Sequence, residues 1–566
     1  EMNSLSTTTT RHFKRFYSLQ LRSNKFSSQT FKKQQNSLKF LNTNFNNVSL
    51  TTSALASRSN AASFLSTRHF SSKKQTVVKT GGDVNDKPAS KKAVDALMMK
   101  AVMLANEDKM EESRAVLQDA VEQYRKMKST DGIIRSLNTL ALLHAKERNY
   151  LECCAALTEC VELARTLPDG KEMLQKLLQQ LGTSYAEAER DDSARETLKE
   201  ALELAKELKI AGAQGLANLS LGALASPLRG RKGAIYQTAV RHLNAAIKNF
   251  EMADDVDHQL KCTVLLAREH HGAQNLDLSN QVWDQVLQIC EPMPSRVEEW
   301  EAYYGLAENY ANMGDEHLKL CLDSYKEALS TAEQLKNPQL QMMTLQSLGL
   351  AYFASKQHSE ALETAEKFHE LARTAGDNIN AVVQSLIQMA RFTEPIDIKQ
   401  ALQQYEAAVS AAVSKAPGSE AEAMAVARLA DARRRNDEDA IAMQLFEKCV
   451  RICKKLGDPP LTIEVLTNLG QLHQKSQSYK EAISCLKRAE EISEGVLGAD
   501  LHRLNLLMLM GQIYRSMNKP IQANDALAKG MTLAGALHRQ GVIKDLPQEF
   551  KDALEQGQKE SAEEQK

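Results

Sequence analysis

The sequence has few aromatic residues and no long apolar run. Phe, Trp and Tyr together make up 5% of its 566 residues, and only two of these are Trp. This scarcity disfavours a β-rich fold, because strands favour aromatic and β-branched side chains, whereas the abundant Ala, Leu, Glu, Lys and Gln favour helices. No stretch approaches the roughly 18 uninterrupted apolar residues that a membrane span needs. The sequence therefore predicts a helical protein with no transmembrane segment, and it leaves peripheral contact with a membrane open.

Acidic residues are missing from the first part of the chain. Residues 2–82 contain thirteen Lys or Arg and no Asp or Glu. Together with Glu1 they carry a charge of +12, which leaves −13 for the remainder of a chain whose net charge is −1. A basic, Ser- and Thr-rich leader before an acidic body is typical of a mitochondrial transit peptide, and the segment Arg11 to Arg22 can form its amphipathic basic helix.

A candidate processing site follows in this leader. Arg68-His69-Phe70-Ser71 is similar to the pattern that mitochondrial processing peptidase cleaves, an Arg, any residue, an aromatic and a small residue. We therefore expect a transit peptide over residues 1–70, cleavage after Phe70, and a linker over residues 71–90. The mature protein would then lie in the mitochondrial matrix or on the matrix side of the inner membrane. The alternative is a basic tail without this targeting role, for example one that binds nucleic acid.

The cysteines do not form a recognisable framework. There are nine, an odd number, and their spacings match neither a disulfide scaffold nor paired Cys-x9-Cys motifs. Cys449 and Cys453 lie four residues apart on an expected helix, but two thiolates without a nearby second pair or His make a poor zinc site. We expect small side chains packed between helices in a reducing compartment, and we predict no metal site and no cofactor.

A glycine-containing dipeptide recurs with a regular period. Five Leu-Gly or Met-Gly pairs occur, and their glycines are separated by 40, 127, 121 and 41 residues. The two short intervals are one period of about 40 residues, and the two long ones are about three periods. These glycines are Gly182, Gly222, Gly349, Gly470 and Gly511. Helix-breaking segments such as Gly457-Asp458-Pro459-Pro460 recur with the same period, so one repeating unit covers most of the chain.

Each unit has the apolar periodicity of two helices. Leu178, Leu181-Gly182 and Tyr185 form one stripe, and after a polar break Ala194, Leu198 and Ala201 form a second. Two helices of 12 to 18 residues joined by a tight turn make a helical hairpin. Glycine inside a helix costs about 1 kcal/mol relative to alanine, so its recurrence predicts a close crossing where a larger side chain would push the helices apart.

The order of residues in each unit resembles the tetratricopeptide repeat, with its large residue, Leu-Gly or Leu-Ala, Tyr three positions later, a turn, and then Tyr, Ala and a large residue. About eleven such units fit residues 91–540, followed by a charged C-terminal cap or tail over residues 541–566. The resemblance implies an all-α helical-hairpin solenoid that forms a right-handed superhelix. The period near 40 exceeds the common 34 and is similar to that of kinesin light chains and LGN-type adaptors.

Some units depart from the pattern. The unit at Leu221 carries an insert from Ser226 to Gly233, the unit at Tyr310 has a longer turn, and the unit at Met389 lacks the Leu-Gly pair.

Other motifs do not point to a reaction. Arg229 to Ala234 contains glycines and basic residues but lacks the spacing of a phosphate-binding loop. His270 and His271 are adjacent, so they point about 100° apart on a helix, and His270 stands where other units carry Tyr, which predicts a packed histidine. Ala432 to Asp439 reads as the end of one helix and the start of the next. With no nucleophile motif and an acidic body, we predict neither an enzyme nor a nucleic-acid-binding protein.

The remaining candidate is a partner-binding groove. In tetratricopeptide repeats the first helix of each unit lines the concave face, and there it receives a partner's peptide or helix. Counting from the packing stripe, its free side would carry Arg135, Asn138, Leu142, Lys176, Gln179, Thr183, Thr467, Asn468, Gln471, Asn505 and Gln512. The carboxylate clamp of chaperone adaptors is not reproduced, because Met98 and Val102 occupy polar positions of that clamp.

These features predict a mitochondrial scaffold or adaptor that binds protein partners, in the manner of an assembly factor or an accessory subunit of a larger complex. Two alternatives stay open at this point. One is a cytosolic adaptor of the kinesin light chain or LGN type, and the other is a regulatory subunit of an enzyme or of a mitoribosomal complex.

Overall fold

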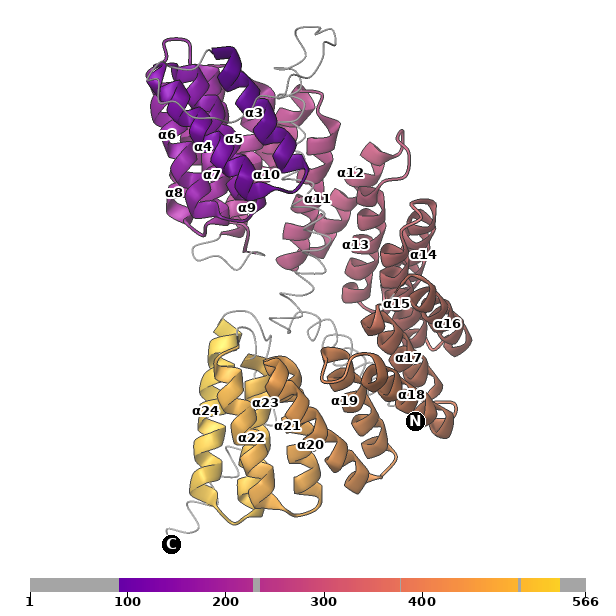
Figure 1. The fold of residues 1–566 in the computed structure, drawn as a ribbon. Helices are drawn as coiled ribbons and strands as arrows, with labels where there is room; N and C mark the ends of the chain where they lie inside the picture. The colour runs from indigo at the N-terminus through magenta and orange to yellow at the C-terminus, as the bar shows by residue number, and fades with distance from the viewer. Residues whose placement is uncertain (1–90, 228–234, 377, 497–499, 540–566) are drawn as a thin grey trace. The chain divides into compact units, whose positions relative to one another are not determined.

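A computed structural model describes residues 91–227, 235–376, 378–496 and 500–539 (Figure 1). They form twenty-two α-helices and one short 3-10 helix, and no strand occurs among these residues. The expected transit peptide, linker and C-terminal tail lie outside the described residues. So do the processing residues Arg68, Phe70 and Ser71 and most of the basic insert, residues 228–234.

The described helices belong to two units, residues 91–336 and residues 337–539. The N-terminal unit contains α3 (Lys91–Asn106), α4 (Met110–Lys126), α5 (Thr130–Lys146), α6 (Tyr150–Arg165), α7 (Lys171–Glu187), α8 (Asp191–Glu207), α9 (Ala211–Ala225), α10 (Tyr236–Met252), α11 (Val256–Gly272), α12 (Leu276–Cys290), α13 (Val297–Met313), η2 (Asp315–His317) and α14 (Leu318–Gln334). The C-terminal unit contains α15 (Pro338–Ala354), α16 (His358–Thr374), α17 (Ile379–Thr393), α18 (Ile398–Lys415), α19 (Glu420–Arg435), α20 (Asp439–Leu456), α21 (Pro459–Lys475), α22 (Tyr479–Glu494), α23 (Asp500–Ser516) and α24 (Pro520–Arg539).

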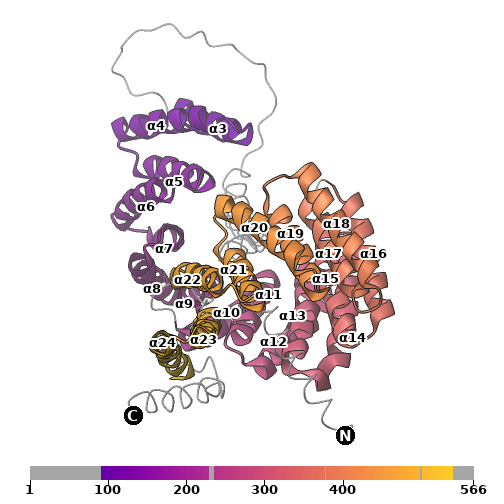
Figure 2. The ribbon, with the colours of Figure 1, turned by 90° about the horizontal axis from the view of Figure 1, so that it is seen from below.

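Within each unit every helix packs against the helix before it and the helix after it, as Figures 1 and 2 show. Each odd-numbered helix forms a hairpin with the even-numbered helix that follows, which gives six hairpins in the N-terminal unit and five in the C-terminal unit. The all-α hairpin array predicted from the sequence is confirmed. The longer turn at Tyr310 is confirmed too, because η2 lies between α13 and α14.

The boundaries between hairpins follow the expected breaking residues. Gly457 ends α20 in the left-handed conformation, with φ 64°, and the Asp458 side chain then accepts a hydrogen bond from the Leu461 backbone N–H, at 3.3 Å. Pro459 begins α21, where its missing N–H costs no hydrogen bond. The segment Ala432 to Asp439 likewise spans the end of α19 and the start of α20.

The recurring glycines lie at close crossings. A Cβ added to Gly182 would lie 2.6 Å from Leu198 Cγ and 3.3 Å from the Leu198 backbone N of the paired helix α8. Gly470 and Gly511 meet a leucine of their own hairpin in the same way, at 2.9 and 2.8 Å. Gly349 differs, because its nearest contact is Gln388 of the next hairpin, at 2.9 Å. The predicted close approach is therefore confirmed, since van der Waals contact between carbon atoms is optimal near 3.5–4.0 Å.

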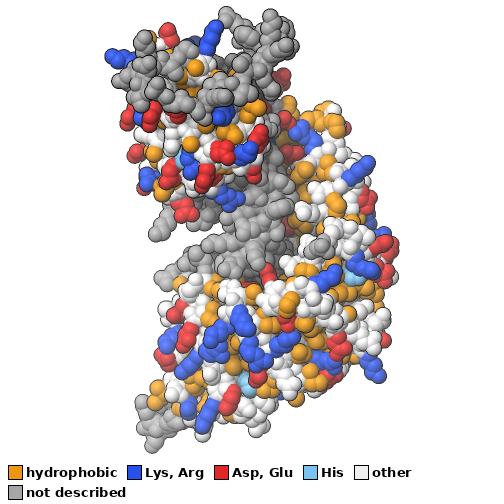
Figure 3. All heavy atoms as spheres, in the orientation of Figure 1, with side chains coloured by type: hydrophobic (Ala, Val, Ile, Leu, Met, Phe, Trp, Pro, Cys, Tyr) orange, Lys and Arg blue, Asp and Glu red, His pale blue; other side chains and the backbone are white. Residues whose placement is uncertain are grey.

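The surface mixes charges of both signs. On the side shown in Figure 3, Lys and Arg side chains gather on part of the C-terminal unit. On the N-terminal unit the basic and acidic side chains are mixed. Among the described residues no helix combines the length and apolarity that crossing a bilayer requires.

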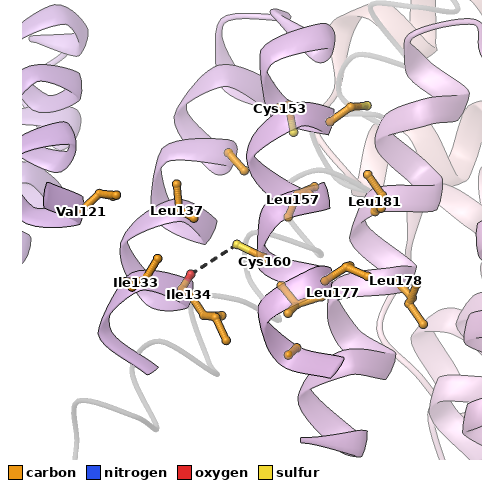
Figure 4. Close-up of a cluster of buried hydrophobic side chains, with 14 of the residues drawn as sticks. Val121, Ile133, Ile134, Leu137, Cys153, Leu157, Cys160, Leu177, Leu178 and Leu181 are labelled. Carbon is orange, nitrogen blue, oxygen red and sulfur yellow. Dashed lines mark hydrogen bonds between the residues drawn. The ribbon is translucent and has the colours of Figure 1, made fainter. Parts of the chain in front are cut away.

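The core runs between the hairpins as a series of apolar clusters. Figure 4 shows one of them in the N-terminal unit, where leucines and isoleucines of α5, α6 and α7 surround Cys160. The Cys160 thiol is fully buried and lies 3.6 Å from the Ile134 carbonyl oxygen, so it fills space and donates a weak hydrogen bond. Eight of the nine cysteines are buried in this way, and Cys485 is half-buried.

Candidate partner-binding face

Odd-numbered helices of neighbouring hairpins contact each other at several steps along the chain. α7 contacts α9, α11 contacts α13, and each step from α15 to α21 makes the same contact between odd-numbered helices. In the described part of the chain no two even-numbered helices touch to a comparable extent. At these steps the odd-numbered helices therefore approach one another more closely than the even-numbered helices do. We call the solvent-facing side of these helices the odd-helix face.

All eleven residues predicted for the groove lie on odd-numbered helices, and none is fully buried. Lys176, Asn505 and Gln512 are exposed, and the other eight are half-buried. Arg135, Asn138 and Leu142 lie on α5, Lys176, Gln179 and Thr183 on α7, Thr467, Asn468 and Gln471 on α21, and Asn505 and Gln512 on α23. Their role in binding a partner stays a prediction.

Four of these residues are engaged within their own helices. Arg135 and Lys176 each form an ion pair with an acidic residue one turn earlier, at 2.7 and 2.8 Å. The hydroxyls of Thr183 and Thr467 donate hydrogen bonds to backbone carbonyls of the preceding turn. These side chains would have to exchange an existing contact for one with a partner.

Two amide side chains offer acceptors on the N-terminal unit. Gln179 Nε2 donates a hydrogen bond to Ser220 Oγ at 2.9 Å, which joins α7 to α9 across the odd-helix face. The side-chain oxygens of Gln179 and Asn138 have no hydrogen-bond partner. Buried polar atoms usually have one, so these oxygens are suited to accept an N–H from a partner's main chain once the side chains turn outward.

Arginines join successive odd-numbered helices across the C-terminal unit. We call three of them, Arg391, Arg428 and Arg435, the arginine ladder. Arg391 of α17 lies over the Phe353 ring of α15, with 5.7 Å from Cζ to the ring centroid. From α19, Arg435 Nε donates a hydrogen bond to Glu394 Oε1, beyond the end of α17, at 2.5 Å, and Arg428 Nη1 donates one to Glu464 Oε1 of α21, at 2.6 Å. Because these side chains cross between helices on the face that a partner would contact, they are candidates for partner binding.

The arginine ladder was not predicted from the sequence, although counting from the packing stripe, as was done for α5 and α7, would have found Arg391. In α5 and α7 the predicted residues lie six and three positions before, and one after, the small residue of the packing stripe. The equivalent small residue in α17 is Ala390, which is fully buried. The same offsets then give Gln384, Ile387 and Arg391. The signal was overlooked because Met389-Ala390 replaces the Leu-Gly pair.

A small hollow lies on the same face, between α17 and α19. It is lined by Asn380, Val383 and Gln384 of α17 and by Glu420, Ala421 and Met424 of α19. Val383 and Ala421 are buried, and Gln384 and Met424 are half-buried. The hollow therefore combines buried apolar side chains with polar groups.

The electrostatics differ along the arginine ladder. The ion pair with Glu464 raises the pKa of Arg428 above its ordinary value. Burial lowers the pKa of Arg391 to about 10, and the nearby charges of Arg428 and Arg435 act in the same direction. The two arginines therefore lie in different surroundings, Arg428 beside a carboxylate and Arg391 over an aromatic ring.

A buried carboxylate occupies the odd-helix side of the N-terminal unit. Glu301 of α13 is only 6% exposed, and Arg268 Nη2 of α11 lies 2.6 Å from its Oε1. The other carboxylate oxygen has no hydrogen-bond partner, and burial raises the pKa of Glu301. This pair links two hairpins at the cost of burying charge.

The histidines and the cysteine pair take structural positions. His270 Nδ1 lies 2.7 Å from the Tyr236 hydroxyl and is buried, which confirms the predicted packed histidine. The thiols of Cys449 and Cys453 lie 3.7 Å apart and are buried in α20. In the part of the chain that the structure describes, no three His, Cys, Asp or Glu side chains are arranged to hold a metal ion.

Comparisons with known proteins point to the same type of repeat. The tetratricopeptide-repeat family model matches residues 461–536, which include most of α21 to α24. No curated protein matches the chain. The hairpins described above and this match support a scaffold for protein–protein interaction.

Several solved structures are similar at low identity. A STAND signal-transduction ATPase of Pyrococcus horikoshii with a tetratricopeptide-repeat sensor is 12% identical, with a TM-score of 0.41, and the match covers 59% of this chain and 54% of that one. The apo form of the quorum sensor NprR of B. thuringiensis is 12% identical, with a TM-score of 0.38 and coverage of 64% and 99%. Kinesin light chain repeats of Podosopora anserina are 16% identical, with a TM-score of 0.31 and coverage of 35% and 96%.

Proposed function

We propose that this protein is a mitochondrial scaffold that holds segments of partner proteins on its odd-helix face. A helical hairpin buries too little surface to stand alone, so the hairpins support one another and leave one long side free. The observation that carries the proposal is the odd-helix face itself. It presents half-buried polar side chains on successive hairpins, among them amide oxygens that lack a hydrogen-bond partner.

The mitochondrial part of the proposal rests on the leader. Thirteen basic and no acidic residues over residues 2–82, with a processing pattern at Arg68 to Ser71, are typical of transit peptides that direct import into the matrix. Within mitochondria the protein would act as an assembly factor or as an accessory subunit that keeps two partners in register. Fusion of residues 1–80 to a fluorescent protein tests the location, and cytosolic fluorescence would refute it.

Binding on the odd-helix face is tested by proximity labelling with the full chain. A double variant, Asn138→Ala with Gln179→Ala, removes the two acceptors, and we expect it to lose a subset of the labelled proteins. The matched control is Gln118→Ala with Gln444→Ala, because both glutamines are exposed on even-numbered helices. Equal labelling by the two double variants would argue against this face, and RNA recovered in place of proteins would argue against a protein scaffold.

A further inference from the structure

The first helix of the N-terminal unit, α3, has an exposed apolar side. Met99, Val102 and Met103 are 60%, 44% and 63% exposed, and Ala96 on the same side is exposed too. Across the helices that the structure describes, no other one exposes more than one large apolar side chain. Single exposed apolar residues are ordinary on a protein surface, whereas a contiguous group of them marks an interaction site.

The equivalent side of later odd-numbered helices is covered by the preceding hairpin. In α5, α21 and α23 the positions five before and two after the small residue of the packing stripe are buried. The residues there are Ser136 and Leu143, Val465 and Leu472, and Leu506 and Ile513. Leu143, for example, shares an apolar cluster with Leu117 of the preceding helix α4, and the other two hairpins repeat this arrangement.

In α3 the same two positions are Ala96 and Met103, because its buried small residue is Ala101. The exposed side of α3 therefore continues the interface that joins one hairpin to the next. Elsewhere in the chain an amphipathic helix packs on this interface, so we expect a helix to pack on α3 as well.

The part of the chain before α3 does not suit this side. Lys91, Lys92 and Lys100 are exposed on α3, and they would repel residues 2–82, which contain thirteen Lys or Arg and no acidic residue. Residues 83–90 contain a single large apolar residue, Val84, which is too little to cover the exposed methionines. A suitable occupant brings both apolar and acidic side chains.

A second copy of α3 brings both. The turn after α3 carries the exposed residues Glu107 and Asp108, so α3 is basic at its first turn and is followed by acidic residues at its other end. Two antiparallel copies that cross between residues 99 and 100 place three pairs of residues opposite each other: Lys91 and Asp108, Lys92 and Glu107, and Ala96 and Met103. In this register the charges are complementary, a small side chain faces a large one, and the helix dipoles oppose each other favourably.

Contacts within each chain do not prevent this pairing. Glu107 forms an ion pair with Lys109 at 2.9 Å, and Asp108 forms one with Lys146 at 3.4 Å. Both pairs are exposed, and exposed ion pairs contribute little to stability, so the acidic side chains can turn toward a second copy at small cost.

We propose that two copies of this protein form a dimer through antiparallel α3 helices. A two-fold interface uses the same patch on both copies, so each of the three pairings occurs twice. The flexible side chains of Met99 and Met103 can adapt to the opposite helix. This inference goes beyond the proposed scaffold function and does not depend on it, because α3 lies at the start of the N-terminal unit (Figure 2) and carries none of the eleven predicted groove residues.

Sedimentation velocity of the full chain tests the dimer. We expect a species of twice the 62.9 kDa of one chain, whose share grows as the concentration rises from about 1 to 100 µM. Met99→Glu with Met103→Glu places four carboxylates in the interface and should raise the dimer Kd by about a hundredfold or more. The matched control, Leu151→Glu with Leu320→Glu, changes two exposed leucines on even-numbered helices and should alter the Kd less than twofold.

Exchange of charges tests the antiparallel register. Lys91→Glu with Lys92→Glu places acidic residues opposite acidic ones, and Glu107→Lys with Asp108→Lys places basic residues opposite basic ones. Each double variant should weaken the dimer by about tenfold, and an equimolar mixture of the two should restore a Kd close to the native one. Circular dichroism of each variant shows whether it remains folded.

Two results would overturn the inference. One is a native chain that sediments as a monomer over this range, whether α3 then binds another protein or a membrane surface. The other is a dimer that neither the methionine variant nor the charge variants weaken, because such a dimer uses another surface. Neither result bears on the scaffold function, which proximity labelling tests separately.

Discussion

Replacing Gly182 by alanine sets two opposing effects against each other. Alanine in a helix interior is favoured over glycine by about 1 kcal/mol, so propensity alone predicts a more stable protein. The added Cβ, however, would lie 2.6 Å from Leu198 Cγ and 2.7 Å from Leu198 Cδ2, about 1 Å inside van der Waals contact. Leu198 is fully buried, so it cannot move aside into solvent. Overpacking of this kind costs about 1–3 kcal/mol, and we expect Gly182→Ala to lose about 1 kcal/mol overall.

The measurement has to be local, because repeat arrays do not always unfold in one step. Hydrogen exchange of the amides in residues 171–207, which cover α7 and α8, reports the opening free energy of this hairpin. Gly212→Ala in the first turn of α9 is the control, and its effect is read from the amides of α9 itself, residues 211–225. Its Cβ would meet only Ala253 Cβ at 3.9 Å, so it should gain up to about 1 kcal/mol in α9. If Gly182→Ala slowed exchange as the control does, the close-contact explanation would be refuted.

Three further predictions concern the turns, a buried acid and the thiols. Gln477 is exposed in the turn before α22 and has a left-handed backbone, with φ 59°. Glycine adopts this conformation readily and a β-branched residue does not, so in thermal unfolding we expect Gln477→Gly to be neutral or stabilising by up to about 1 kcal/mol and Gln477→Val to be destabilising. Burial raises the pKa of the Glu301 carboxyl above its ordinary 4.5, so the native state binds a proton at Glu301 more tightly than the unfolded state does. The free energy of unfolding that this protonation adds is therefore lost as the pH rises from 4.5 through the raised pKa. A Glu301→Gln variant should lack this decline when its free energy of unfolding is measured by urea titration at successive pH values. If the variant showed the same pH dependence as the native chain, Glu301 would not be its cause. Because burial also raises the pKa of Cys160 and of most other thiols, a disulfide reagent should modify at most Cys485 quickly in the native chain and all nine thiols in denaturant.

The packing of the hairpins was predictable because it constrains particular positions. A residue such as Gly182 must be small wherever two helices cross closely, and this constraint recurs every 40 residues or so in the sequence. The helix boundaries were predictable for a similar reason, since Gly457, Asp458 and Pro459 each suit one place at the junction of two helices. The pairing of Gly349 with Gln388 of the next hairpin was not predictable, because the dipeptide is the same in both kinds of crossing.

The candidate site was predictable only where the register was clear. In α5, α7, α21 and α23 a Leu-Ala, Leu-Gly or Met-Gly pair sets the count, and the residues chosen from it lie on odd-numbered helices. In α17 the pair is Met389-Ala390, so the count was not made and Arg391 was passed over. The segment Ala432 to Asp439 was correctly placed at a helix end, but its arginines were not assigned to contacts with other hairpins.

The acidic partners of those arginines explain why the rest was out of reach. Arg435 pairs with Glu394, 41 residues earlier, and Arg428 with Glu464, 36 residues later. Each distance is about one repeat, so such pairs form only between equivalent helices of neighbouring hairpins. Packing positions such as Gly182 are small or apolar in successive repeats of this chain, whereas the residues on the odd-helix face differ from repeat to repeat. Contacts between odd-numbered helices of different hairpins therefore become visible only when neighbouring repeats are aligned in space.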